Sequence, residues 1–310
     1  KIRALVELSA EFARLLGYYV AEGYCRAYEN RTGHMTYSII IYNKDEELLE
    51  DVAKCIKASL GITPRRGTRY IAINSKIAYV LFNEVLRMGG RAEEKRIPHM
   101  LFNAPKEFKM EFLRAYCRGD GSFGRSDVKL TTKSEELANQ LIILLAQLGI
   151  KGISMSREGT VYRIWVRDNR LARRPAKRRT YAYVIPNAFV REMAERLRMF
   201  GYVYKDGKNL RLERARTLLK EYKTRFGDDP KTRALSILLN GDVALDSVKR
   251  TKWVRPTNGA VYDISVNGHE NFVGGFGMVC LHNSYGIFGA DIFEFYCPPV
   301  AESTAAIGRH

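Results

Sequence analysis

The sequence has few cysteines, and their spacing suits neither a disulfide framework nor a zinc site. The five cysteines lie at positions 25, 55, 117, 280 and 297, and no two of them form a CxxC pair. An odd number of widely separated cysteines argues against both kinds of cross-link. Disulfide-rich scaffolds and zinc-binding modules are therefore excluded.

Long apolar runs are also lacking. The longest, near LIILLAQLGI, is too short and too interrupted to span a bilayer, and no charged and then apolar leader opens the sequence. We therefore expect a cytoplasmic protein with no membrane partner. Because Lys1 is not a translational start, we also expect the chain to be the downstream portion of a longer protein.

Acidic residues are the minority charge. The chain has 34 Asp and Glu against 51 Lys and Arg, which gives a formal net charge of +17. Much of the excess lies between residues 151 and 180, where ten basic residues face only Glu158 and Asp168. This balance favours a polyanionic partner, with nucleic acid first, over an acidic small substrate. The alternative is the charged surface of a heat-adapted protein, because such proteins enrich charge of both signs.

The sequence repeats itself. The stretches LLGYYVAEG and LRAYCRGDG both read as an apolar helix that ends on a carboxylate and a glycine, and their acids, Glu22 and Asp120, are 98 residues apart. Three further landmarks follow each of them in the same order: NKDEEL and TKSEEL, LGI and LGI, and IP and IP. Ordered landmarks at a nearly fixed offset indicate the duplication of one unit of about ninety residues.

Each copy reads as helix, hairpin, helix, hairpin, helix. Leucines at helical spacing predict helices that end before Gly61 and Gly149, and the alternating stretches TYSIIIYN and VYRIWVR predict strands. We therefore predict an α+β fold of two pseudo-symmetric αββαββα-like units. The first copy carries about nine extra residues around RAYENRTGHM, which we interpret as a longer hairpin loop.

Small residues on the repeated helices predict that the two copies pack against each other. Gly17 and Ala21 are four residues apart on the first helix, and the aligned positions on the second are Ala115 and Gly119. Small residues at this spacing remove the side-chain ridge from one helix face, so two backbones can approach closely.

The ends of these helices predict a metal site. Gly23 and Gly121 are expected to close the helices in the left-handed conformation, which leaves Glu22 and Asp120 side by side near a pseudo-twofold axis. Two carboxylates at helix C-termini repel each other and the helix dipoles. A pair of Mg²⁺ ions would offset this repulsion and would suit in-line phosphodiester cleavage.

The two stretches resemble the paired motifs of LAGLIDADG (DOD-type) homing endonucleases, and the resemblance extends over about residues 8–205. It implies Mg²⁺-dependent double-strand cleavage of a long DNA site by a monomer, with strands lying in the groove. By position, Glu22 and Asp120 are implied to be the metal-binding acids.

A lysine accompanies the acids. Family members that lie within inteins carry a KxIP motif before the second acid, and the KRIP of this sequence places Lys95 there. A lysine beside a scissile phosphate can stabilise developing charge or help to activate water. The second copy has YVIP, with Tyr183 in the matching place. Either Lys177 substitutes for the missing lysine, or the two strands are cut at unequal rates.

Basic strand faces predict the DNA contacts. Alternation in VYRIWVR places Arg163, Trp165 and Arg167 on one side of a strand, where they are expected to contact phosphate and sugar. Alternatively, Trp165 and its flanking arginines form a cation–π packing feature. Further DNA-contacting candidates lie in PRRGTRY and in the basic run of the second copy: Arg65, Arg66, Arg69, Lys177, Arg178 and Arg179.

A second chemistry is suggested near the C-terminus by the tripeptide His282-Asn283-Ser284. An asparagine side chain can attack its own carbonyl carbon, which forms a succinimide and breaks the following peptide bond. His282 can protonate the departing amine, and the Ser284 hydroxyl can receive an acyl group beforehand.

The context of this tripeptide resembles an intein. VYDISVNGHENFVGGFG resembles the C-terminal splicing (Hint) blocks, which implies that Asp263 is the block aspartate. Residues 284–310 resemble the start of a flanking segment from an archaeal family B DNA polymerase, so the implied cleavage target is the intein-less polymerase gene. An N-terminal splicing junction and a TxxH block are not found ahead of the first repeat, so complete splicing is expected to need an N-terminal splicing segment in cis or in trans.

The predicted organisation has four parts: an endonuclease at 1–205 with copies at about 8–108 and 109–205, a basic linker and helical DNA-contact segment at 206–235, a β-rich partial splicing segment at 236–283, and polymerase sequence at 284–310. Two alternatives stay open. One is a module of the same fold that binds DNA or RNA without cutting it. The other is an element in which only splicing survives.

Overall fold

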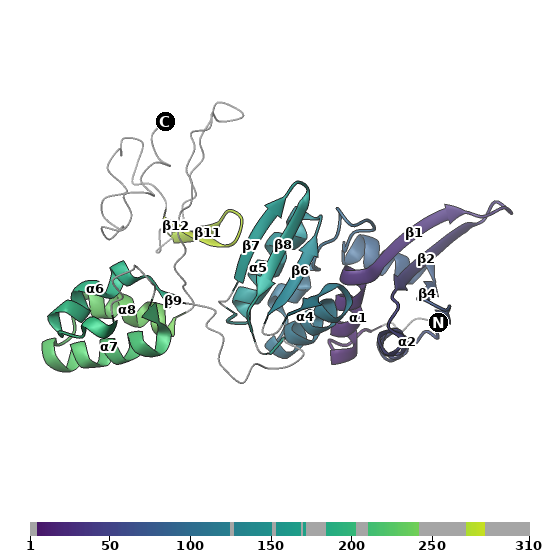
Figure 1. Cartoon of the computed structure of the whole chain (residues 1–310). Coiled ribbons are helices and arrows are strands. Elements are labelled where there is room, and N and C mark those ends of the chain that lie inside the picture. The colour runs from purple at the N-terminus through teal and green to yellow at the C-terminus, as the bar shows by residue number, and fades with distance from the viewer. Residues whose placement is uncertain are drawn as a thin grey trace, which may run out of the picture. The chain divides into compact units, whose positions relative to one another are not determined.

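The computed structural model describes residues 5–124, 127–150, 153–168, 170–171, 184–202, 210–241 and 271–282. The chain has two compact units, residues 1–182 and 183–310. The elements of the first unit, coloured purple to teal in Figure 1, are α1 (Ala10–Glu22), β1 (Gly23–Glu29), β2 (Met35–Tyr42), α2 (Glu46–Leu60), β3 (Arg65–Arg66), β4 (Tyr70–Asn74), α3 (Lys76–Val80), the π-helix η1 (Leu81–Val85), the 3₁₀-helix η2 (His99–Asn103), α4 (Lys106–Asp120), β5 (Ser122–Phe123), β6 (Val128–Thr132), α5 (Glu135–Gln147), β7 (Ile153–Glu158) and β8 (Val161–Val166).

The first unit contains two four-stranded antiparallel sheets with the same strand order. The order is β1-β2-β4-β3 in the first sheet and β5-β6-β8-β7 in the second. A helix with an acidic end precedes each sheet, and a second helix crosses over between its two hairpins. The prediction of a duplicated α+β unit is therefore confirmed.

The crossover helices begin and end as their sequences predict. Side chains at the N-caps, Asp45 of α2 and Ser134 of α5, accept a hydrogen bond from a backbone N–H of the first turn. Gly61 and Gly149 follow the helices with φ of 70° and 69°, a conformation that glycine adopts at little cost. These helices are confirmed at both ends.

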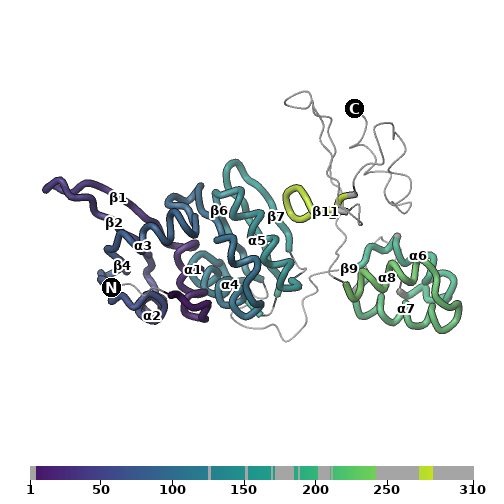
Figure 2. Tube along the Cα trace, turned by 180° about the vertical axis from the view of Figure 1, so that it is seen from behind, coloured from purple at the N-terminus to yellow at the C-terminus, as the bar shows by residue number. Residues whose placement is uncertain are grey.

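The two copies meet where α1 packs on α4, as the ribbon in Figure 1 and the tube in Figure 2 show. A Cβ added at Gly17 would lie 2.3 Å from the carbonyl oxygen of Phe112 and 2.9 Å from the Cβ of Ala115. A Cβ added at Gly119 would lie 2.7 Å from the Cβ of Ala21. The helices therefore touch through their backbones, which only glycine and alanine at these positions permit.

The prediction that left-handed glycines end α1 and α4 is wrong. Gly23 has φ −88° and ψ 157°, and Gly121 has φ −85° and ψ 130°, so the chain runs from each helix directly into an extended strand. Glycine is required here for space. An added Cβ would lie 2.7 Å from the carbonyl oxygen of Tyr19 at the first site and 2.3 Å from that of Cys117 at the second.

The extra residues of the first copy lengthen its strands, so the prediction of a longer hairpin loop is also wrong. β1 and β2 have 7 and 8 residues, whereas β5 and β6 have 2 and 5. The turn at residues 30–34 stays short because the Asn30 side chain accepts hydrogen bonds from the N–H groups of Thr32 and His34. Figure 2 shows β1 and β2 as a projecting arm.

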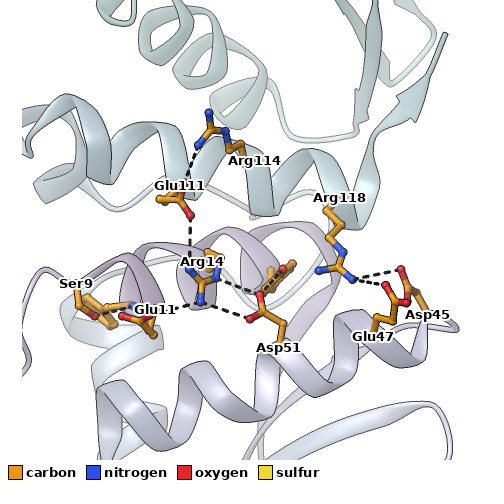
Figure 3. A network of polar contacts seen from close by, with 11 residues as sticks. Ser9, Glu11, Arg14, Asp45, Glu47, Asp51, Glu111, Arg114 and Arg118 are labelled. Atoms are coloured by element: carbon orange, nitrogen blue, oxygen red, sulfur yellow. Dashed lines mark hydrogen bonds and ion pairs between the residues drawn. The ribbon is translucent and has the colours of Figure 1, made fainter. Parts of the chain in front are cut away.

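A polar network joins the two copies near the start of α1 (Figure 3). Arg14 donates to Asp51 of α2 at 3.1 Å, and it also forms ion pairs with Glu111 of α4 at 3.5 Å and with Glu11 at 3.6 Å. The Tyr18 hydroxyl donates to Asp51 at 2.8 Å. One guanidinium thus links α1, α2 and α4.

The second unit contains a small helical module and a separate hairpin. Its elements are β9 (Val184–Ile185), α6 (Asn187–Arg196), η3 (Phe200–Tyr202), β10 (Leu210–Arg211), α7 (Leu212–Phe226), α8 (Pro230–Asn240), β11 (Asn271–Gly274) and β12 (Val279–His282). Buried residues of β9, β10 and the three helices form one core. The last predicted helix of the second copy therefore shares this core with the predicted basic segment. Of the helices that the structure describes, none is both long and apolar enough to cross a membrane.

We expect Gly17→Ala to lower the free energy of unfolding by about 3 kcal/mol, because the added methyl meets backbone that cannot rotate away. In a unit of this size the melting temperature should fall by roughly 5–10 °C in calorimetry. Gly90→Ala, in the same unit, is the matched control, since an added Cβ there has no neighbour nearer than 3.5 Å. An equal effect of the two substitutions would contradict the close approach of α1 and α4.

Candidate functional site

The structure brings the two predicted acids together. Glu22 is the last residue of α1 and Asp120 is the last residue of α4. A Cβ added at Gly119 would lie 3.2 Å from the Cγ of Glu22, and both carboxylates line one cleft. Because α1 and α4 belong to different copies, each copy contributes one acid.

The electrostatics of the cleft favour protonation of both acids. Burial raises the pKa of Glu22, although a hydrogen bond from Asn43 opposes the effect. Asp120 keeps an exposed side toward the cleft, yet the protein around it, and then the charge of Glu22, raise its pKa to about 7. Neither acid forms an ion pair with a lysine or arginine that the structure describes. The pair therefore carries a repulsion that no described lysine or arginine offsets.

Sequence reasoning missed Asn43, which orients the first acid. Its side-chain Nδ2 donates to Glu22 Oε1 at 3.0 Å, while its Oδ1 accepts from the backbone N–H of Asp45 at 2.8 Å. The matching position of the second copy is Thr132, whose Oγ1 accepts from the N–H of Ser134 at 3.1 Å. The alignment of NKDEEL with TKSEEL marks this position as part of the repeat and is the signal that could have found it.

Lys95 lines the same cleft, but its ammonium group is directed at α1. Only 6% of the residue is exposed, its Nζ donates to the carbonyl oxygen of Tyr19 at 3.0 Å, and Nζ lies 3.8 Å from the centroid of the Tyr19 ring. Burial lowers the pKa of Lys95 to about 7. The lysine is therefore close to half protonated near neutral pH. Tyr19, a second residue that sequence reasoning missed, holds it in place.

The donor set fits Mg²⁺ but not a metal that needs more protein ligands. No cluster of three or more His, Cys, Asp or Glu side chains occurs among the residues that the structure describes. Mg²⁺ is commonly held by one or two carboxylates, with water and substrate phosphate completing its coordination. The buried Tyr116 hydroxyl lies near Asp120, whose charge adds to the effect of burial in raising the Tyr116 pKa. Glu22 and Asp120 are thus the residues that would hold such an ion.

The predicted contact face of the second copy has the orientation that alternation indicated. Tyr162, Ile164 and Val166 of β8 are at most 4% exposed, whereas Arg163 and Trp165 are partly exposed on the opposite face of the sheet. Arg167 follows the strand and is exposed. Arg163 forms an ion pair with Glu158, and no described cation lies over the Trp165 ring. The alternative that Trp165 is a cation–π packing feature therefore has no support within the described residues.

The arginines of the first copy do not all face the same way. Arg65, Arg66 and Arg69 are exposed. Arg65 pairs in register with Ala72, on the open face of the sheet, whereas Arg66 forms an ion pair with Glu46 of α2 on the other face. Arg65 is thus free of the helix layer, and Arg66 is tied to it.

Several predicted site residues lie outside the described residues. They are Lys177, Arg178, Arg179, Tyr183, Asp263, Asn283 and Ser284. His282 is the last residue of β12 and pairs in register with Asn271 of β11. His282 is also the residue that precedes Asn283 in the sequence.

Comparison with known proteins finds both a domain family and close relatives of the whole chain. Residues 9–89 and 107–178 match the family described as LAGLIDADG-like domain. Over 313 aligned residues, which cover all of this chain, it is 37% identical to the DNA polymerase of Thermococcus hydrothermalis and 38% identical to that of Thermococcus sp. strain GE8. The chain spans only 18% of the length of these polymerases.

A solved structure of I-DmoI, in complex with DNA and Mn, is also similar to this chain. The similarity covers 52% of this chain and 90% of that one, with a TM-score of 0.41 and 17% sequence identity.

We expect Lys95→Met to stabilise the protein most at and below neutral pH. A lysine whose pKa is lowered on folding costs stability in full below the folded pKa, and the cost disappears as pH rises toward the unfolded pKa of 10.5. The difference in free energy of unfolding between variant and wild type should therefore decrease by about 4 kcal/mol from pH 6 to pH 10, measured by chemical denaturation. Lys44→Met, at an exposed position, is the control. A difference that did not change with pH would refute the burial of a charged ammonium group.

Proposed function

We propose that this chain, which belongs to the LAGLIDADG-like domain family over residues 9–89 and 107–178, is a site-specific DNA endonuclease. It makes Mg²⁺-dependent double-strand breaks in a long target within the uninterrupted gene of an archaeal polymerase. Its net charge of +17 suits a polyanionic partner of this kind.

One observation carries the proposal. Glu22 and Asp120, each from one copy of a duplicated unit, line one cleft, and the charge of Glu22 increases the tendency of Asp120 to bind a proton or a cation. A structural salt bridge would pair these acids with lysine or arginine, and none of the described lysines or arginines does so. A pair of acids near a pseudo-twofold axis suits a duplex, whose two strands are also related by twofold symmetry.

The two carboxylates would hold Mg²⁺. When bound, the ion would stabilise the charge that develops on the phosphate during cleavage. The contribution of the chain is to fix the acids in advance: α1 and α4 cannot shift without separating touching backbones, and Asn43 holds the Glu22 carboxylate through its amide.

Lys95 would accept or donate a proton beside the acids. Its Nζ is held by the Tyr19 carbonyl and ring, and its pKa of about 7 lets the same group accept a proton as an amine or donate one as an ammonium ion near neutral pH. The cleft that it shares with both acids brings it within the region where the scissile linkage would bind.

Strand faces and a helical segment would hold the DNA. The open faces of the two sheets carry Arg65, Arg163 and Trp165, and exposed Arg167 follows β8; contacts of these residues to the DNA backbone would provide salt-sensitive affinity. The predicted DNA-contact segment at 206–235 contains α7, with five basic and two acidic residues between Leu212 and Phe226. We retain Lys177, Arg178 and Arg179 as proposed contacts.

A second proposed activity is the C-terminal half of protein splicing. The chain aligns from end to end within longer polymerases, as an intein inside its host protein would. His282, the residue before Asn283 in the sequence, lies in β12 and pairs in register with Asn271. Cyclisation of Asn283 would release the C-terminal flank, with His282 protonating the leaving amine, once an N-terminal splicing segment is present. Asp263 and Ser284 keep their proposed splicing roles.

We expect Asp120→Asn to lower Mg²⁺-dependent double-strand cleavage by at least about a hundredfold, because it removes a charge that holds the ion. Cleavage of a plasmid carrying the uninterrupted polymerase gene measures this, with and without Mg²⁺. Glu50→Gln, at an exposed position of α2, is the control and should cut normally.

Unchanged cleavage by Asp120→Asn would refute the assignment of the acids. Binding of DNA by a wild-type chain that cuts no strand in Mg²⁺ would instead support a module that binds nucleic acid without cutting it.

We expect Asn283→Ala to prevent release of the C-terminal flank when the chain is mixed with an N-terminal splicing segment, because alanine has no nucleophilic amide. Mass spectrometry of the products measures release. Asn240→Ala, at the end of α8, is the control and should release the flank normally. If the Asn283→Ala chain still released its flank, the splicing proposal would be wrong.

A further inference from the structure

Three tyrosines form a cluster on the open face of the first sheet. We call Tyr24 of β1, Tyr42 of β2 and Tyr70 of β4 the tyrosine cluster. Tyr42 pairs in register with Tyr70, and Tyr24 pairs with Ile40, two residues before Tyr42, so all three side chains share one face. The opposite face carries buried isoleucines and belongs to the core.

The three rings contact one another and are at least partly exposed. The rings of Tyr24 and Tyr42 stack with centroids 6.0 Å apart and planes 4° apart, and the rings of Tyr42 and Tyr70 have centroids 5.5 Å apart. The Tyr70 ring also covers Gly67, where an added Cβ would lie 2.2 Å from it. Tyr42 is nevertheless 45% exposed. Rings that are held by neighbouring rings suit recognition, because such side chains lose little conformational entropy on binding.

The cluster adjoins the proposed catalytic acids. Tyr24 follows Glu22 by two residues and lines the same cleft. Tyr42 directly precedes Asn43, whose amide donates to Glu22. A duplex whose scissile linkage lies at the acids would therefore place its neighbouring base pairs over these rings.

The second sheet presents different chemistry at the matching positions. Ser122, two residues after Asp120, takes the place of Tyr24. Thr131 takes the place of Tyr42, and its partner in register is Arg163, where the first sheet has Tyr70. One copy thus offers aromatic rings beside its acid, whereas the other offers hydroxyl and guanidinium groups.

We propose that the tyrosine cluster determines base specificity on the first-copy side of the cleavage position. This inference rests on the proposed function. In the major groove thymine presents a methyl group and each base pair presents its own hydrogen-bond pattern, so ring faces and phenolic hydroxyls distinguish base pairs where charge alone does not. The cluster carries no charge, so its contribution depends on sequence and adds nothing to counterion release. Arg26 and Arg65, which lie on the same face, supply the phosphate contacts around it.

The test measures sequence-specific binding without cleavage, and it uses the full chain with Asp120→Asn. This variant is incubated with a randomised duplex library, and the bound fraction is sequenced. Adding Tyr42→Ala should reduce discrimination by about tenfold at one or two base pairs on one side of the selected site. The slope of affinity against salt should not change. Tyr42→Phe, which keeps the ring, should retain preference for thymine and lose only hydrogen-bonded preferences.

Two further variants serve as comparisons. Arg65→Ala should weaken binding to all sequences alike and reduce the salt slope by about 1. Thr131→Ala should alter preference on the other side of the site. A selected site that is the same with and without Tyr42→Ala, in a variant that melts normally, would overturn the proposal. If the chain with Asp120→Asn alone selects no sequence, the proposed function fails first, so the two failures are distinguishable.

Discussion

The contact between the backbones of α1 and α4 is the constraint on which the remainder of the first unit depends. Gly17 and Gly119 let two helices from different copies touch without side chains between them. Because each helix ends on a carboxylate, the same contact places Glu22 beside Asp120 and creates the repulsion that helps to raise the pKa of Asp120 to about 7. Close packing and an unfavourable pair of charges thus have one cause. The Arg14 network secures the start of these helices (Figure 3).

Features that depend on period and local chemistry could be predicted from the sequence. The crossover helices, the inward face of β8 and the duplication itself followed from leucine spacing, strand alternation and ordered landmarks. The pairing of the acids followed because small residues and carboxylates recur at matched places. These signals are all contained within one copy or in the comparison of the two copies.

Features that depend on how chain segments meet in space could not be predicted. Glycine at a helix end suggests a left-handed residue, but Gly23 and Gly121 are extended because the adjoining strand starts at once. The direction of the Lys95 side chain depends on Tyr19, 76 residues earlier in the chain. The tyrosine cluster combines residues of three strands whose register the sequence does not specify.

The separation of contact helix and sheet within each copy has a consequence for how such a protein diverges after its gene is duplicated. A substitution on the touching faces of α1 or α4 must be compatible with the facing helix of the other copy. Those positions can therefore change only together. The open faces of the two sheets are under no such shared constraint. One carries tyrosines at positions where the other has serine, threonine and arginine. The two copies are therefore constrained to stay alike where α1 meets α4, whereas the open faces of their sheets can diverge in sequence.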